Sequence, residues 1–229
     1  MQMQRDEDTT YATLNGAWEW QPATPGEAPF FGAPLNSSIN VPFPVESCLS
    51  GVNETHMAMW YRLVVDRPAE FPSGGLVRLH FEAVDWQTSV WLNGELLGNH
   101  TGGYSHFSYS LPTFQATGNE ILVYVFDPSD TGPQPMGKQR LSALIAPSGD
   151  HYTPSSGIWG PVWLEHVPTT FISSLKITPT LTDVTINVTT ETASGPVTEQ
   201  PFQVTAMDAS GATVASGSGT SGVPIRLAI

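Results

Sequence analysis

The chain has 229 residues and a formal net charge of −13, because 21 acidic side chains face only eight Lys and Arg. Nucleic acids are bound through clustered cations, so this balance argues against a nucleic-acid partner. Forty per cent of the residues are hydrophobic and seven are Trp, which is enough for a packed core. The 21 Gly and 20 Pro are typical of an all-β protein with many turns.

Short strand patterns follow one another along the first two thirds of the chain, after a polar stretch over residues 1–10 that we expect to be a disordered arm. Asn93-Gly94 is a strong signal for a hairpin turn. Nothing reads as a long amphipathic helix, so we expect a jelly-roll β-sandwich over residues 11–168. The strands are expected at 18–20, 39–41, 60–65, 76–81, 88–92, 95–100, 107–111, 120–126 and 162–167.

The texture changes after residue 168, where Thr, Val and Ser alternate and Trp is absent. This pattern predicts immunoglobulin-type strands over residues 169–229. A full sandwich of that type needs about seven strands and ~100 residues, so we expect a partial domain with an unpaired, pairing-prone edge. Self-association as a homodimer, or docking to a second chain, would cover such an edge.

The single cysteine, Cys48, excludes an internal disulfide and has no basic neighbour, so we expect a buried, unreactive side chain. No apolar run is long enough to cross a membrane, and Met1–Asp8 is too polar for a signal peptide. Four sequons and few Lys favour an extracellular protein whose signal peptide is absent from this chain. The glycosylation candidates are Asn36, Asn53, Asn99 and Asn187.

Six ordered motifs carry a family resemblance. They are Leu14-Asn15-Gly16-Ala17-Trp18, Val41-Pro42-Phe43-Pro44, Trp60-Tyr61-Arg62, Val90-Trp91-Leu92-Asn93-Gly94, Gly102-Gly103-Tyr104 and Gly157-Ile158-Trp159. In this order and spacing the chain resembles the N-terminal half of glycoside hydrolase family 2, which holds β-galactosidases, β-glucuronidases and β-mannosidases. The resemblance covers roughly residues 11–228. It implies a sugar-binding domain followed by the start of an immunoglobulin-like domain.

Several loop residues are candidates for contact with carbohydrate. Glu46 could accept hydrogen bonds from sugar hydroxyls, although a solvated turn explains it equally well. By resemblance, Asp130 stands where related β-galactosidases carry a galactose- and cation-contacting Asp, while a capped turn on Asp127 or Asp130 is the alternative. Aromatic rings pack against the C–H faces of sugars. The candidates of this kind are Tyr104, His106, Tyr152 and Trp159, and domain-interface packing would explain Tyr152 and Trp159 equally well.

A metal site is only weakly indicated. His100, His106 and His151 lie on different loops without the short spacing of zinc ligands. Asp127 and Asp130, with Asp150, could supply oxygen ligands to a structural calcium or sodium ion, but no loop of EF-hand type is present. We expect no cofactor.

Family 2 enzymes are retaining glycosidases whose two catalytic carboxylates lie about 5–5.5 Å apart. The resemblance places both on a barrel that this chain does not contain, so we predict no catalytic residue here. The pairs Asn53-Glu54 and Asn119-Glu120 lie in a polar loop and at a strand start, and neither is expected to be a catalytic acid. The leading hypothesis is thus a non-catalytic carbohydrate-binding portion of a truncated family 2 architecture. A glycosidase with a new site and a structural or docking fragment remain the alternatives.

Overall fold

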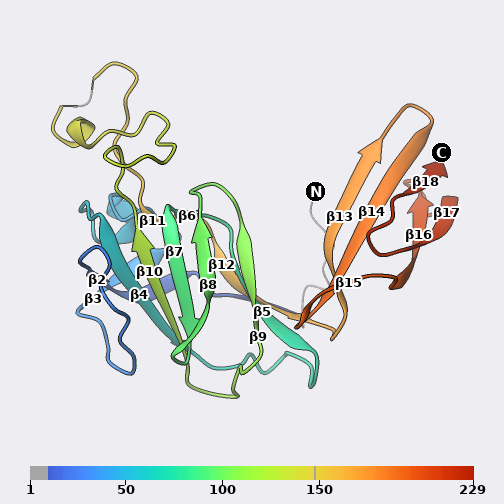
Figure 1. The fold of residues 1–229 in the computed structure, drawn as a ribbon, viewed down its shortest axis with the longest axis horizontal. Coiled ribbons are helices and arrows are strands. Elements are labelled where there is room, and N and C mark those ends of the chain that lie inside the picture. The colour runs from blue at the N-terminus through green and yellow to red at the C-terminus, as the bar shows by residue number, and fades with distance from the viewer. Residues whose placement is uncertain (1–9, 147) are drawn as a thin grey trace. The chain divides into compact units, whose positions relative to one another are not determined.

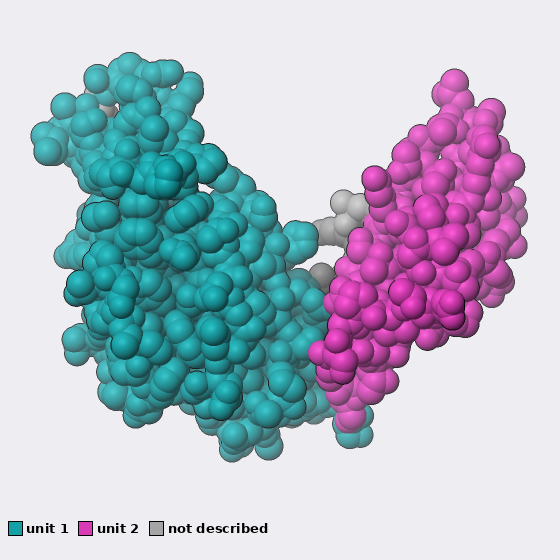
Figure 2. Space-filling view, viewed as in Figure 1, with its two compact units in different colours: residues 1–73, 77–166 teal, residues 74–76, 167–229 magenta. Residues whose placement is uncertain are grey.

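The computed structural model describes residues 10–146 and 148–229, so the arm expected over residues 1–10 lies, apart from Thr10, outside the described part. Strands dominate, and the pairings between them are antiparallel (Figure 1). The expected all-β class is confirmed. Two compact units are formed, one by residues up to Ser73 with Val77–His166, the other by Gly74–Leu76 with Val167–Ile229 (Figure 2).

Two sheets and one short strand pair build the first unit. The smaller sheet has the order β1 (Tyr11–Thr13), β12 (Val162–Val167), β5 (Leu76–Phe81), β9 (Phe107–Leu111). The larger has the order β3 (Ser37–Val41), β2 (Gly16–Pro22), β4 (Ala58–Val65), β10 (Asn119–Phe126), β7 (Gln87–Leu92), β8 (Glu95–Thr101). The pair is β6 (Val84–Asp85) with β11 (Gly157–Ile158).

The main core lies between these two sheets. Alternate residues of each strand point inward, as the period of two requires. Ile121, Val123 and Val125 of β10 are fully buried, and Leu79 and Phe81 of β5 are buried opposite them. One cluster unites side chains from both sheets, so the first unit is a β-sandwich of the expected kind.

The outer face of the larger sheet is also covered, by the Pro- and Gly-rich segment 23–36. Trp60 and Leu122 are buried there against Leu35, with Phe30 and Tyr124 packed around them. All four residues of Ala58–Tyr61 are buried, not every second one, because this part of β4 is covered on both faces of the sheet.

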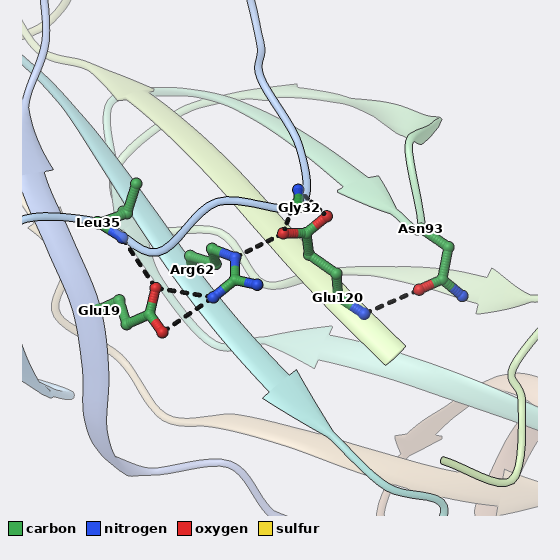
Figure 3. Close-up of polar contacts among 6 residues, drawn as sticks. All are labelled: Glu19, Gly32, Leu35, Arg62, Asn93 and Glu120. Carbon is green, nitrogen blue, oxygen red and sulfur yellow. Dashed lines mark hydrogen bonds and ion pairs between the residues drawn. The ribbon is translucent and has the colours of Figure 1, made fainter. Parts of the chain in front are cut away.

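Arg62 and two carboxylates fasten this segment to the sheet (Figure 3). Arg62 donates from Nε to Glu120 over 2.5 Å and from Nη1 to Glu19 over 2.8 Å. The same carboxylates accept backbone N–H bonds from the covering segment, Glu120 from Gly32 at 3.0 Å and Glu19 from Leu35 at 2.9 Å. Burial disfavours the charge of Arg62, but the bonds to Glu120 and Glu19 outweigh it, and the pKa of Arg62 is raised.

Asn93 and Gly94 form the turn between β7 and β8, as the sequence predicts. Both have positive φ, 51° and 88°, which matches the two-residue hairpin turn. The side chain of Asn93 also accepts the backbone N–H of Glu120 at 2.8 Å (Figure 3). The turn is therefore tied to the neighbouring strand.

The second unit has six strands in two small sheets. β14 (Asp183–Thr192) pairs with β13 (Phe171–Pro179) along one edge and with β15 (Gly195–Val197) and β18 (Ile225–Ala228) along the other. β16 (Pro201–Met207) and β17 (Thr213–Thr220) form a two-stranded sheet. A small core of Val184, Ile186, Val188 and Leu227 joins them. Self-association through these strands stays a prediction.

The expectation that Cys48 is buried is wrong. Its thiol is exposed in the short 3-10 helix η1 (Cys48–Ser50), because the residue that this turn buries is Ser50. The other 3-10 helix, η2 (Leu141–Leu144), lies in the long loop after β10. Among the described residues, no helix is long and apolar enough to cross a membrane.

Candidate functional site

Three acidic side chains from distant parts of the sequence gather in the first unit. Glu46 follows β3, Asp85 ends β6 and Asp127 comes directly after β10. Asp85 and Asp127 are buried, and Glu46 is partly exposed. Their charges interact, because Asp127 and Glu46 both raise the pKa of Asp85. The fold thus concentrates negative charge at one place.

Ser156 joins two of these carboxylates. Its backbone N–H donates to Oε2 of Glu46 at 2.9 Å, and its hydroxyl donates to Oδ2 of Asp127 at 2.7 Å. The carbonyl of Ser156 accepts the N–H of Val45 at 3.0 Å. The other oxygen of Asp127 accepts the N–H of Ser129 at 2.7 Å. Asp127 therefore caps a turn, as one of the sequence alternatives states, and also holds the segment that leads into β11.

Gln139 joins the third carboxylate to the same segment. Its Nε2 donates to Oδ2 of Asp85 at 3.2 Å, and its Oε1 accepts the N–H of Ser155 at 2.7 Å. Ser155 and Ser156 are thus bound by three side chains, Glu46 from the loop after β3 and Asp127 and Gln139 from the loop after β10.

Burial and mutual repulsion favour the neutral form of two of these acids. Burial, followed by the charge of Asp127, raises the pKa of Asp85 to about 6, although the bond from Gln139 opposes the rise. Burial also raises the pKa of Glu46, against the hydrogen bonds from Ser156. Oε1 of Glu46 is buried and has no hydrogen-bond partner within the described residues. Glu46 therefore has one acceptor that no described residue uses.

Gly103 allows a loop to close over Asp85. A Cβ at position 103 would lie 2.5 Å from Cγ of Asp85, so only glycine fits at this contact. The carbonyl of Gly103 accepts the indole N–H of Trp159 at 2.9 Å. The ring of Tyr104 meets Trp159 edge-on, with centroids 5.7 Å apart, and Tyr104 is 74% exposed. An aromatic pair, of which Tyr104 is exposed and Trp159 half-buried, therefore lies beside the acidic cluster.

The other residues predicted as sugar contacts are Tyr152, His106 and Asp130. Tyr152 is 64% exposed, and Lys138 lies 6.0 Å above its ring. His106 is exposed on the loop that carries Tyr104. Asp130 is half-buried and makes no hydrogen bond or ion pair within residues 10–146 and 148–229, and its role as a sugar contact stays a prediction.

No metal site accompanies these residues. Among the described residues, no group of three or more His, Cys, Asp or Glu side chains is arranged to hold a metal ion. His100 stacks on Phe107 with centroids 4.1 Å apart, and His151 lies 3.8 Å from Asp150. The suggested oxygen ligands Asp127 and Asp130 do not form such a group either.

Three of the four sequon asparagines are exposed, namely Asn36, Asn53 and Asn99. Asn187 lies within β14, between β13 and β18, and is half-buried. A glycan is attached at an exposed side chain, so Asn36, Asn53 and Asn99 remain glycosylation candidates and Asn187 is the least suitable of the four.

Comparison with known proteins assigns the family. The family model described as "Glycosyl hydrolases family 2, sugar binding domain" matches residues 7–168. The chain belongs to glycosyl hydrolase family 2. The resemblance carried by the six sequence motifs is thereby confirmed.

Two curated relatives of this family 2 chain are 31% identical to it. One is a protein of Formosa agariphila named provisionally as a β-glucuronidase, aligned over 145 residues. The other is a β-galactosidase of Thermoanaerobacter pseudethanolicus, aligned over 140 residues. The alignments cover 62% and 57% of the chain but only 16% and 17% of the relatives. The chain therefore corresponds to about a sixth of their length.

Solved structures extend the similarity to both units of the family 2 chain. A Faecalibacterium prausnitzii β-glucuronidase matches with a TM-score of 0.67 and 24% identity, over 98% of this chain and 42% of that one. The Ruminococcus gnavus β-glucuronidase matches with a TM-score of 0.68 and 20% identity, over 100% of this chain and 40% of that one. At these identities the likeness is one of fold.

Four participants in the site were not predicted from the sequence: Asp85, Gln139, Ser156 and Tyr61. Asp85 gave one signal, since it is a charged residue in an otherwise apolar stretch, Ala83-Val84-Asp85-Trp86. Gln139 and Ser156 look like ordinary loop residues. Tyr61 is part of a strand motif, and its hydroxyl faces the backbone N–H of Ile158 at 3.4 Å. Burial raises its pKa, so the phenol stays protonated.

Proposed function

We propose that this chain contacts carbohydrate as the non-hydrolytic, sugar-binding portion of a family 2 β-glycosidase. The observation that supports this most is that Oε1 of the partly exposed Glu46 has no hydrogen-bond partner among the described residues, while the exposed Tyr104 and the half-buried Trp159 contact each other beside the acidic cluster. A carboxylate with an unused acceptor near an aromatic surface is a combination that suits sugars.

The roles follow from the chemistry of a pyranose ring. Its C–H face would pack on Tyr104 and Trp159, and one hydroxyl would donate to Glu46. Asp85 and Asp127 are buried and already accept bonds from Gln139, Ser156 and Ser129, so they support this surface rather than touch the ligand. A surface of this size buries little of its ligand, and we expect dissociation constants of about a millimolar.

The substrate class is a β-glycoside. The two curated relatives are named for β-glucuronides and β-galactosides, which share the β-linkage and differ in the charge at C6. Catalysis would belong to other parts of the longer protein. The present chain would supply one wall of its pocket.

Ligand titration tests this proposal. Chemical shifts of the backbone N–H groups of Ile158 and Gly160, followed with methyl β-galactoside and methyl β-glucuronide, should report binding at Trp159. Trp159→Ala and Glu46→Gln should each weaken binding about tenfold or more, the loss expected for a charged hydrogen bond or an aromatic contact. Phe31→Ala, a change at an aromatic residue on segment 23–36 that is 40% exposed, is the control and should bind normally. Unchanged affinity in both site variants would overturn the proposal.

Glycoside hydrolysis by this chain itself is the second candidate, favoured by the raised pKa of Asp85 near other carboxylates. Its burial beneath Gly103 argues against it, because a catalytic acid must reach the scissile oxygen. Assays on aryl β-galactosides and β-glucuronides separate the two. Turnover that survives repurification and disappears in Asp85→Asn would establish hydrolysis.

A further inference from the structure

We propose that Gln139 is a positioning residue for this site, whose amide couples Asp85 to segment 152–156 and so fixes the approach to Trp159. The sugar-facing role of that segment rests on the function proposed above. The coupling itself consists of hydrogen bonds within the chain, so it does not depend on a bound ligand.

Gln139 forms hydrogen bonds through both ends of its amide. Asp85 presents a carboxylate, which accepts, and Ser155 presents a backbone N–H, which donates. Only a side chain that donates at one atom and accepts at another can join them, and a neutral amide does both. Gln139 makes the two bonds at 3.2 Å and 2.7 Å.

The backbone around Gln139 is paired with the same segment. The N–H of Arg140 donates to the carbonyl of Tyr152 at 2.9 Å, and the N–H of Tyr152 donates to the carbonyl of Lys138 at 2.9 Å. Together with the side chain, these bonds hold residues 138–140 against 152–155. Hydrogen bonds then link Asp85 through Gln139 to Ser155, which is the covalent neighbour of Ser156.

Ser156 carries this coupling to Glu46, the proposed ligand contact. Its N–H donates to Oε2 of Glu46 and its hydroxyl to Asp127. Gly157 and Ile158 follow as β11, and Trp159 comes next. A shift of Ser155 would therefore move Ser156 and alter the alignment of Glu46 with Trp159.

Within residues 10–146 and 148–229, no cation takes the place of the amide at Asp85. Arg140 donates from Nη1 to the carbonyl of Gln139 at 2.7 Å, and Nζ of Lys138 lies 3.5 Å from Asp150. The ionisable groups on the elements around Asp85 are Glu46, Tyr61, Glu82, His100, Tyr104, His106, Asp127, Asp130, Lys138, Arg140, Asp150, His151 and Tyr152. Of these, Asp127 and Glu46 act on the Asp85 charge, and both repel it. A carboxylate at position 139 would add a further repulsion.

Two substitutions at Gln139 test the coupling. Gln139→Met keeps the length of the side chain and removes both bonds. Gln139→Glu keeps the acceptor, but its charge repels Asp85 until the pair takes up a proton, after which the acid group donates again. Gln203→Met, at an exposed position of β16, is the matched control. The readout is amide exchange of Ser155, corrected for the intrinsic rate at each pH, with Val123 of β10 as the internal reference.

The expected result is a pH-dependent rescue. At pH 7.5 both Gln139 variants should lose Ser155 protection by about tenfold, the effect of one or two lost hydrogen bonds. At pH 5 the Glu variant should recover and the Met variant should not. Normal Ser155 protection in the Glu variant at pH 7.5, or no recovery at pH 5, overturns the proposal. Sugar affinity measured on the same samples should follow the same pattern. If the unsubstituted chain binds no sugar, that result counts against the proposed function. The amide exchange of Ser155 then decides by itself whether Gln139 is a positioning residue.

Discussion

Gly157 packs directly against the hydroxyl of Tyr61. A Cβ on Gly157 would lie 2.1 Å from that oxygen, and the backbone of Gly157 has a φ of +89°. The hydroxyl in turn lies 3.4 Å from the N–H of Ile158. The glycine of the Gly157-Ile158-Trp159 motif is thus required by the strand beneath it.

Gly157→Ala should destabilise the first unit by about 2–5 kcal/mol, because positive φ and overpacking both oppose the new methyl group. Urea unfolding followed by Trp fluorescence measures this. Gly26→Ala is the control, since Gly26 has a φ of +78° but open space around it. Equal losses in the two variants would show that the contact with Tyr61 is unimportant, whereas partial rescue by Tyr61→Phe would confirm it.

Arg62→Met should loosen segment 23–36 by leaving Glu19 and Glu120 without their cation. Removal of one member of a partly buried ionic network costs about 2–3 kcal/mol, less than for a fully buried pair. Chemical denaturation gives the free energy of unfolding. Addition of Glu120→Gln should restore part of the loss. Arg226→Met breaks the surface pair with Asp183 in the second unit and should change little. The idea fails if both Arg substitutions behave alike.

Asp85 predicts a pH dependence of stability. Its pKa rises on folding, from 3.8 to about 6, so folding favours the protonated form. The stabilisation is complete below the unfolded pKa and is lost as the pH rises through about 6. The first unit should therefore gain roughly 1 kcal/mol from this group between pH 7.5 and pH 5.

Asp85→Asn should remove that gain and raise stability at pH 7.5 by relieving the repulsion from Asp127 and Glu46. Thermal melts at the two pH values provide the measurement. Glu95→Gln, exposed at the end of the β7–β8 hairpin, should leave the pH dependence intact. A pH response in Asp85→Asn equal to that of the unsubstituted chain would contradict the assignment.

Asn119→Leu should be strongly destabilising, because this fully buried side chain satisfies four partners. It accepts from the N–H of Gln115 at 2.7 Å and from Asn93 at 3.3 Å, and it donates to the carbonyls of Gln115 and Val65. Orphaning the backbone groups should cost about 3 kcal/mol or more. Equilibrium unfolding tests this, and Asn99→Leu, at an exposed strand position, should have a small effect.

The sequence by itself determined the class of fold and the family. Alternation with a period of two marked the strand Leu76–Phe81, an apolar run marked the strand over residues 120–126, and Asn93-Gly94 marked a turn. These signals are local, because side-chain direction along a strand and positive φ at a turn depend on neighbouring residues alone. The family motifs are likewise contiguous, and for this reason Glu46, Tyr104 and Trp159 could be named as candidates.

Only the tertiary structure decided which of those candidates meet and what holds them. Asp85, Gln139 and Ser156 are separated by 54 and 17 positions, and no local pattern links them. Their hydrogen bonds form because the end of β6 and the loop after β10 arrive at the same place in the sandwich. The hydrogen bond that Ser156 donates to Asp127 has the same origin, because it joins residues 29 positions apart and exists only when the chain is folded.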